Sequence, residues 1–495
     1  MATGPSTTTA PYLVPLNANV TTTSILTVGD SVGGYRMAGI PDGLGAFDNG
    51  NGTFTVLMNH ELGSKLGAVH AHGATGAFVS KWTVDKSTLA VTAGEDLIKQ
   101  TLTWDTATAS YKAGAVALDR LCSADLPATT AFYNAASGKG YADGRIFMSG
   151  EESADGRAFA HFVTGSEAGN SYELARMGNL SFENVVASPH ASDKTIVIGL
   201  DDSRPGQVYV YVGDKTSTGT ALDKAGLTNG KLYGVKVDGA ADETRDAAGG
   251  FSSAQPNFSM VDFGDVSSLD GKTLQSRSET AGVTEFLRPE DGAWDPNTPG
   301  RFYFVTTDRF DTLKPDGAHP EYNQTFTFDQ HVTGEDATSR LWQMDFTDPA
   351  DPSKGGKLTM LLDGNEGQQM LDNMTVTRDG KIILQEDPGN QAYSAKVWQY
   401  DIRTDTLIPL AEHDPRLFGT AVRPTAAITR DEESSGVIDV TDLVGTTNGR
   451  SYLLTDQIHA RNADPALVEG GQLTLMTVRT TSTKAAAAEL DYFIA

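Results

Sequence analysis

The chain has 495 residues, 38 of them basic and 64 acidic, which gives a formal net charge of -26 at pH 7. This acidity argues against a nucleic-acid partner, because phosphate backbones are bound by basic surfaces. The single cysteine excludes an intramolecular disulfide, and no run of eighteen apolar residues is present that could span a membrane. The length exceeds that of one hydrophobic core, so we expect several packed units or one repetitive architecture.

The first segment of the chain carries no clear strand or helix pattern. It also lacks the basic and apolar regions of a signal peptide. We therefore expect residues 1–20 to form an extended N-terminal arm.

Short strand patterns dominate the rest of the chain, separated by turns rich in Gly, Asp, Asn and Pro. The clearest predicted strands are 52–61, 144–153, 194–203, 206–214, 230–239, 301–310, 340–348, 380–390, 396–410 and 451–460. Helical patterns are few and are limited to residues 126–136 and 485–493. The composition of these segments predicts an all-β protein.

A repeated unit is visible among these strands. One strand ends in a polar or acidic cluster, a second strand carries Leu-Trp or aromatic-x-aliphatic patterns, and a third follows. We interpret this as an irregular six-bladed β-propeller with long insertions, forming one domain over residues 1–495. A large β-sandwich is the alternative. The propeller is favoured because the polar clusters recur at one strand end, where they would converge on a central channel.

Carboxylates directly after apolar strands are the most informative feature. Buried carboxylates need a partner or a bound cation, and several in one channel would repel each other without cations. Glutamate is also a poor turn residue. The clusters at these strand ends contain Asn59, Glu61, Glu151, Glu152, Glu183, Asp201, Asp202, Glu290, Asp372, Asn373, Glu386, Asp387 and Glu433. Oxygen ligands of this kind favour Ca²⁺, Mg²⁺, Mn²⁺ or Fe³⁺.

The only cysteine, Cys122, lies in the polar segment LDRLCSADLP. A free cysteine is most often a small buried apolar residue. Here Arg120 could lower its pKa and favour the thiolate, which is the form that binds metal. A nucleophilic role has less support, since no motif of a cysteine hydrolase is present.

Arg288 and Glu290 are two residues apart, so in a strand both side chains would point to the same face. We expect one to bind an anion and the other a metal, because a guanidinium group matches phosphate oxygens in pairs. A surface salt bridge between the two is the alternative.

Six segments of the chain resemble the PhoX family of bacterial alkaline phosphatases. The resemblance extends from about Asn59 to Glu433, and the matching motifs are VLMNHELG, LCSADLP, GRIFMSGEES, SFENV, FLRPEDGAWDP and LDNMTVTRDGKIILQEDPGN. The Arg-Pro-Glu-Asp-Gly segment is among the most specific of these, and the cysteine segment is more divergent.

The resemblance implies a six-bladed propeller with Fe³⁺ and Ca²⁺ in its channel. It implies Arg288 and Glu290 as catalytic residues. It also implies a set of metal ligands, which on this chain are Asn59, Glu61, Cys122, Glu151, Glu152, Glu183, Glu290, Asp372, Asn373, Glu386 and Glu433.

The activity implied by the resemblance is metal-dependent hydrolysis of small phosphate monoesters. It further implies a monomer in the periplasm or outside the cell, with no membrane partner. Two alternatives remain open at this point. One is another propeller hydrolase, of the calcium-dependent phytase-like or lactonase-like type, and the other is a non-catalytic calcium-binding propeller for adhesion or recognition.

Overall fold

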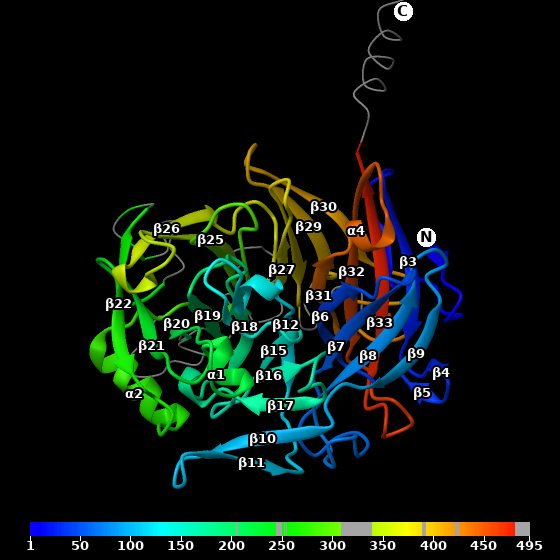
Figure 1. Ribbon diagram of the computed structural model, residues 1–495. Coiled ribbons are helices and arrows are strands. Elements are labelled where there is room, and N and C mark those ends of the chain that lie inside the picture. The colour runs from blue at the N-terminus through cyan, green and yellow to red at the C-terminus, as the bar shows by residue number, and fades with distance from the viewer. Residues whose placement is uncertain are drawn as a thin grey trace, which may run out of the picture.

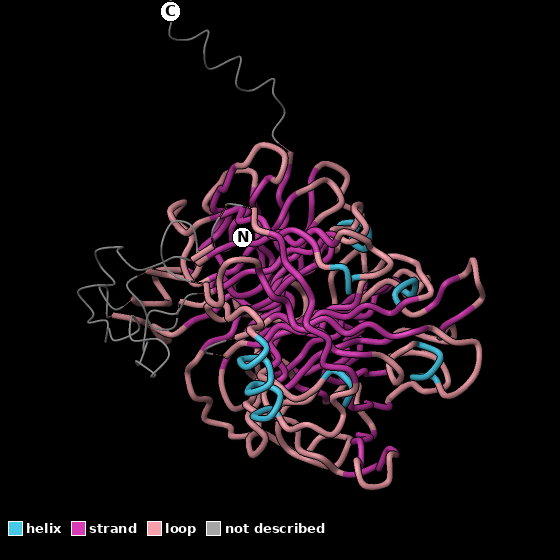
Figure 2. Tube along the Cα trace, turned by 90° about the vertical axis from the view of Figure 1, so that its left-hand side faces the viewer, coloured by secondary structure: helices cyan, strands magenta, loops and turns pink. Residues whose placement is uncertain are grey.

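The computed structural model describes residues 1–203, 206–243, 250–251, 253, 255–307, 339–388, 393–420 and 425–480. Strands dominate these residues, and they are grouped around one centre (Figures 1 and 2). The helices are short: α1 (Ala221–Ala225), α2 (Gly271–Ala281), α4 (Thr441–Val444), and the 3₁₀ turns Thr129–Ala131, Ala175–Met177 and Pro352–Lys354.

Each group of strands begins with one innermost strand and continues outward through neighbours that are antiparallel except for the pairs β10–β17 (Gln100–Asp105 with Asn170–Glu173) and β1–β3 (Ala2–Thr3 with Val20–Thr27). The β6 group contains β6 (Pro41–Asp48), β7 (Thr53–His60), β8 (Phe78–Asp85) and β9 (Val91–Asp96). The β12 group contains β12 (Leu121–Asp125), β15 (Ile146–Glu151), β16 (Ala158–Phe162) and β17 (Asn170–Glu173), extended by β10 (Gln100–Asp105) and β11 (Ser110–Gly114).

The next two groups share one nine-stranded sheet. The β18 group contains β18 (Phe182–Ala187), β19 (Lys194–Asp201), β20 (Val208–Asp214), β21 (Lys231–Val237) and β22 (Asn257–Gly264). The β23 group contains β23 (Pro289–Trp294), β24 (Arg301–Thr306), β25 (Arg340–Phe346) and β26 (Gly356–Leu362). The outer strands β22 and β26 pair with each other and thereby join the two groups.

The last two groups have five strands each, because short segments from the start of the chain are added to them. The β27 group contains β27 (Leu371–Val376), β28 (Lys381–Glu386), β29 (Lys396–Asp401), β30 (Thr406–His413) and β2 (Leu13–Pro15). The β31 group contains β31 (Glu432–Asp439), β32 (Gly449–Ile458), β33 (Gly470–Arg479), β3 (Val20–Thr27) and β1 (Ala2–Thr3). Two small hairpins, β4–β5 (Ser31–Val32 and Tyr35–Arg36) and β13–β14 (Tyr133–Asn134 and Lys139–Gly140), lie outside the groups.

The innermost strands form a closed ring in the order β6, β12, β18, β23, β27 and β31, with β31 lying next to β6 again. Figure 1 shows several of them side by side around the centre of the molecule. The ring is closed because β3, from the start of the chain, pairs along its length with β33, from the end. Strand pairing between the two ends of the chain therefore holds the ring of sheets closed.

The apolar cores lie between neighbouring groups. Leu57, Phe147 and Phe159, for example, are fully buried between the β6 and β12 groups. Alternating apolar side chains of adjacent sheets pack face to face in this way at every junction of the ring. This leaves the inner edges of the sheets free to carry polar side chains toward the channel.

The all-β, propeller-type class predicted from the sequence is confirmed. The blade number of six and the assignment of residues 1–495 to one domain stay predictions, since two of the groups are merged in one sheet. The helix predicted over residues 126–136 is wrong, because this segment forms only a 3₁₀ turn and part of a hairpin. The helix predicted over 485–493 lies outside the described residues. Within the described residues, no helix is long and apolar enough to cross a membrane.

Candidate metal centre

A cavity of about 150 Å³ lies at one end of the ring of innermost strands. Acidic side chains dominate its wall. The lining residues are Asp42, Glu61, Arg120, Cys122, Glu152, Glu183, Asp202, Arg288, Glu290, Asp372, Asp387, Glu433 and His459.

Most of these residues come from two backbone positions that recur around the ring. The first is the second residue of each innermost strand, which places Asp42, Cys122, Glu183, Glu290, Asp372 and Glu433 in the wall. In five of these strands a bulge includes that residue, and in β31 the bulge lies farther along, between Ser435 and Val437. A bulge turns a side chain away from the regular alternation of a sheet, so the fold itself directs this position to the channel.

The second recurring position is the residue that directly follows the second strand of each group. It is occupied by Glu61, Glu152, Asp202, Thr307, Asp387 and His459. The backbone N–H of each donates to the carbonyl of the residue before the innermost strand, over 2.8 to 3.1 Å. This shared hydrogen bond fixes the end of the second strand, so every side chain except that of Thr307 lines the cavity.

Two residues predicted as ligands, Glu151 and Glu386, do not line the cavity. Each immediately precedes a lining residue, so strand alternation turns its side chain into the sheet. Glu151 accepts from Arg157 Nε and Nη2, both at 2.7 Å. Glu386 accepts from Trp398 Nε1 at 2.7 Å.

Asn59 and Asn373 do not line the cavity either, although both are fully buried close to it. Asn59 Nδ2 donates to the carbonyl of Cys122 at 2.7 Å, and Asn373 Nδ2 donates to Ser123 Oγ at 2.5 Å. The Oδ1 atoms of both amides have no partner among the described residues. A buried amide oxygen without a partner is unfavourable, so a water or an ion fits beside each.

The wall contains three groups of side chains whose potential ligand atoms lie within 4.8 Å of one another. They are Asp42, Glu61 and Cys122, then Cys122, Glu152 and Glu183, and finally Glu183, Asp202 and Glu290. Neighbouring groups share Cys122 or Glu183. The donor sets therefore form a row of adjacent positions, two of which include sulfur, while the third has only carboxylate oxygens.

Burial and mutual repulsion raise the pKa of most carboxylates in this wall. Burial acts in the same direction on Glu61 and Asp202, but Arg120 and Arg288 hold the pKa values of these two below the usual range. Burial raises the pKa of Glu183, and the neighbouring Glu290 and Asp42 raise it further. Burial likewise raises the pKa of Asp372, with Glu290 as the next cause. Carboxylates in this state bind protons unless cations lie among them. The residues present therefore fit a set of positive ions.

Cys122 corrects one expectation from the sequence. Burial raises the pKa of its thiol, Glu61 and Glu152 raise it further, and Arg120 only partly opposes them. The guanidinium is instead engaged by Glu61, to which its Nε donates at 2.7 Å, and by Glu152. The thiolate at this position thus depends on a nearby metal ion.

Arg288 lies in the wall beside the carboxylate-only group. Its Nε and Nη2 donate to the two oxygens of Asp202, each at 2.6 Å, and Nη2 lies 3.0 Å from Glu290 Oε1. Arg288 and Glu290 thus face the same cavity as expected, but not through strand alternation, because Arg288 precedes the strand with a left-handed backbone and Glu290 lies at a bulge.

His459 lies in the opposite part of the wall. Its Nδ1 is 2.8 Å from Glu469 Oε2 and its Nε2 is 3.4 Å from Glu433 Oε2. These two carboxylates raise the pKa of His459 against the effect of burial. On this side of the cavity, the imidazole of His459 therefore lies between the carboxylates of Glu433 and Glu469.

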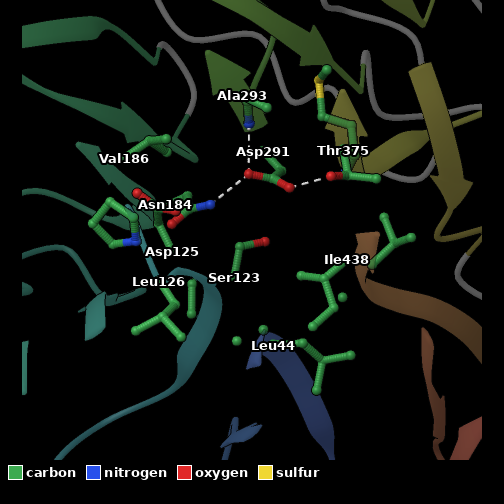
Figure 3. A pocket seen from close by; sticks show the side chains of 18 of the residues that line it. Leu44, Ser123, Asp125, Leu126, Asn184, Val186, Asp291, Ala293, Thr375 and Ile438 are labelled. Carbon is green, nitrogen blue, oxygen red and sulfur yellow. Dashed lines mark hydrogen bonds between the residues drawn. The ribbon is translucent and has the colours of Figure 1, made fainter. Parts of the chain in front are cut away.

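A larger cavity of about 310 Å³ lies at the other end of the innermost strands (Figure 3). Figure 3 shows the apolar side chains of Leu44, Leu126 and Ile438 on its wall, with Ser123 and Asp291 among them. Asp291 accepts from Asn184 Nδ2 at 2.5 Å, Gly292 N at 2.6 Å and Met374 N at 2.9 Å. Its carboxylate is saturated by the protein, so the smaller acidic cavity is the better candidate for metal chemistry.

Eight of the predicted site residues lie in this one cavity: Glu61, Cys122, Glu152, Glu183, Arg288, Glu290, Asp372 and Glu433. Five other lining residues were not predicted as catalytic residues or metal ligands: Asp42, Arg120, Asp202, Asp387 and His459. Alignment of the repeated units on their innermost strands would have found most of them, because they occupy the two recurring positions.

A family model described as alkaline phosphatase PhoX matches residues 166–407. A search of curated proteins finds no match.

Among solved structures, Pseudomonas fluorescens PhoX in complex with vanadate, a transition state analogue, is similar with a TM-score of 0.61 and 10% identity. The similarity covers 93% of this chain and 95% of that one. At this identity it establishes a common fold only.

Two further matches have scores too low to carry an argument. The calcium-binding protein regucalcin of Agrobacterium tumefaciens has a TM-score of 0.31 and 10% identity over 90% of this chain and 93% of its own. The catalytic domain of a Coprinopsis cinerea GH62 α-L-arabinofuranosidase has a TM-score of 0.32 and 11% identity over 78% and 98%. The family model, which matches just under half of the chain, supports the resemblance that the sequence motifs indicate, and the PhoX structure shows that the fold is shared.

Proposed function

We propose that this protein hydrolyses phosphate monoesters, using iron and calcium ions held in the acidic cavity. The observation that carries the proposal is the convergence of the only cysteine, a row of buried carboxylates and Arg288 on one cavity. The match to the PhoX family model supports the same activity class.

The three groups of potential ligands differ in their donor atoms, and this difference would make them prefer different metal ions. Thiolate beside carboxylates favours iron, so Cys122 with Glu61, Glu152 and their neighbours would hold Fe³⁺. Glu183, Asp202 and Glu290 offer only oxygen, which suits Ca²⁺. When bound, the ions would supply Lewis acids for phosphoryl oxygens and a source of hydroxide at moderate pH.

Arg288 is the residue of the chain best placed to bind the phosphoryl group. Its Nε and Nη2 are held by Asp202, which leaves the remaining N–H groups of the planar guanidinium for an anion. Donors fixed in advance stabilise the charge of the transition state without reorganisation. Glu290 and Asp202 hold this arginine in place, and both also belong to the carboxylate group that would bind calcium.

The carboxylates of the wall also make substrate binding conditional. Without cations the cavity repels phosphate, and with cations it attracts the dianion. We therefore propose that activity requires the loaded centre, that the substrates are small phosphate esters, and that the protein acts as a monomer in the periplasm or outside the cell.

The experiment that tests the proposal measures metal content and turnover in the same preparation. The purified protein is subjected to elemental analysis and assayed with p-nitrophenyl phosphate at pH values from 6 to 10. We expect iron and calcium in fixed ratio to protein, and release of phosphate that a chelator abolishes. A chain that contains no iron but is fully active would contradict the iron assignment. Absence of phosphomonoester turnover by the metal-loaded protein would contradict the function.

A further inference from the structure

Arg120 and Arg288 occupy equivalent places in two different strand groups. Each directly precedes an innermost strand, and each has a left-handed backbone, with φ of 45° and 59°. Ile40 and Met370 occupy the same place in two other groups and share this conformation, with φ of 51° and 43°. The backbone conformation therefore belongs to the fold, whereas the arginine side chains are specific to the two groups that flank the β18 group.

The two guanidinium groups are also held in the same manner. Arg120 Nε donates to Glu61 Oε1 at 2.7 Å, and its Nη2 lies 2.7 Å from the same oxygen. Arg288 makes the corresponding contacts to Asp202 at 2.6 Å. In both cases the acid is the residue that follows the second strand of the preceding group. Within the described part of the chain, neither Nη1 has a hydrogen-bond partner.

The two arginines stand on either side of the candidate metal positions. Arg120 contacts Glu152, a member of the group that contains Cys122 and Glu183. Arg288 contacts Asp202 and Glu290, which form the next group with Glu183. An anion bound over the shared Glu183 position therefore has a guanidinium group on each side.

The exposure of the two side chains differs. Arg120 is 48% exposed and Arg288 is 15% exposed, so Arg120 lies at the open mouth of the cavity. A guanidinium at the mouth with free N–H donors is suited to a phosphate oxygen that points outward.

We propose that Arg120 is a second phosphate-binding residue, so that the phosphoryl group is held between two guanidinium groups. This inference rests on the proposed phosphatase function and adds a second residue that binds the phosphoryl group of the same substrate class. Two guanidinium groups and the metal ions together need three terminal phosphoryl oxygens. A monoester dianion has three, whereas a diester has only two and carries one charge fewer. The structure thus favours monoesters over diesters.

The test uses the metal-loaded protein and inorganic phosphate as the probe. Binding of phosphate is measured by calorimetry in the wild type and in the variants Arg120→Gln, Arg120→Lys and Arg288→Gln. Arg378→Gln is the matched control, because Arg378 is 77% exposed and pairs with Asp442 rather than with the cavity. Iron and calcium are determined in each sample. We expect Arg120→Gln to weaken phosphate binding at least tenfold with unchanged metal content, Arg120→Lys to lie between it and the wild type, and the control to match the wild type.

Two results overturn the inference and leave the phosphatase function standing. One is unchanged phosphate affinity in Arg120→Gln while Arg288→Gln loses it. The other is loss of metal in both Arg120 variants, which makes Arg120 a structural partner of Glu61 and Glu152. Phosphate that binds tightly to a wild type without monoesterase turnover would instead count against the proposed function.

Discussion

The two ends of the central channel are built by the same innermost strands, yet their chemistry is opposite. At one end Glu183 and its neighbours form a small cavity that is almost entirely acidic. At the other end, Leu44 and Ile438 line a larger cavity in which Asp291 is hydrogen-bonded through both oxygens. The difference teaches that burial alone does not make a carboxylate a metal ligand. What matters is how many protein donors already satisfy it.

The largest effect is expected from Glu183→Gln, since Glu183 is shared by two of the three ligand groups. The substitution removes a charge at both positions. We expect loss of bound metal and a fall in kcat/KM on the order of 10³-fold, as when a group that stabilises transition-state charge is removed. Elemental analysis with an activity assay measures both. Full metal content and full activity would show that Glu183, like Asp291 at the other end of the channel, is not a metal ligand.

Arg288→Gln should have the next largest effect. We expect kcat/KM for p-nitrophenyl phosphate to fall by about 10²-fold, because a preorganised donor to the phosphoryl group is lost. Metal content should stay close to that of the wild type, since the carboxylates remain. Steady-state kinetics at saturating metal measure the effect. An unchanged kcat/KM would rule out a phosphate contact by Arg288.

The variant Cys122→Ser tests whether the two ligand groups that contain sulfur bind a different metal from the group that contains only oxygen atoms. We expect the visible absorption from iron–sulfur bonding to disappear. Iron affinity should fall by more than about 10- to 100-fold, which is the range for residues that only support the ligands. Calcium should be retained, because the third ligand group contains no sulfur. Absorption spectra and metal titrations provide the measurement. A spectrum identical to that of the wild type would place the iron elsewhere.

The smallest effect concerns Asp125, at the apolar end. Burial raises its pKa to about 7 from an ordinary value of 3.8. The folded state therefore binds a proton that the unfolded state has lost between about pH 4 and 7, so this residue makes the protein less stable as pH rises through that window.

The variant Asp125→Asn should flatten that part of the stability profile and leave metal content unchanged. Denaturant unfolding at pH 5 and pH 8 measures it, with the wild type as the reference for all the other carboxylates. Equal pH dependence in the two proteins would mean that Asp125 ionises normally.

Much of the fold and part of the site followed from sequence patterns. The strands that end in polar clusters were found because apolar runs bounded by turns are a strong local signal. The innermost strands were not recognised as strands. Leu121–Asp125 and Pro289–Trp294 contain several polar residues and a bulge, and they become strands through pairing and channel position rather than through propensity.

Pairs of acidic residues in the sequence did not show which member faces the cavity. In Glu151-Glu152 the sequence named both residues, although alternation allows only one to face the channel. Asp42 and His459 were overlooked because neither lies in an acidic cluster after an apolar run. Both are recognised as site residues only when the strand groups are superimposed, because they then fall on the two recurring positions that line the cavity.

The adjacent residues Glu151 and Glu152 offer the most direct test of the central claim. Iron and calcium per folded protein are measured for Glu152→Gln and Glu151→Gln after refolding in the same metal buffer. We predict that Glu152→Gln loses metal and phosphatase activity, whereas Glu151→Gln is less stable, because it loses its ion pair with Arg157, but retains its metals. Equal metal loss in both variants, or loss only in Glu151→Gln, would contradict the assignment of the acidic cavity as the metal centre.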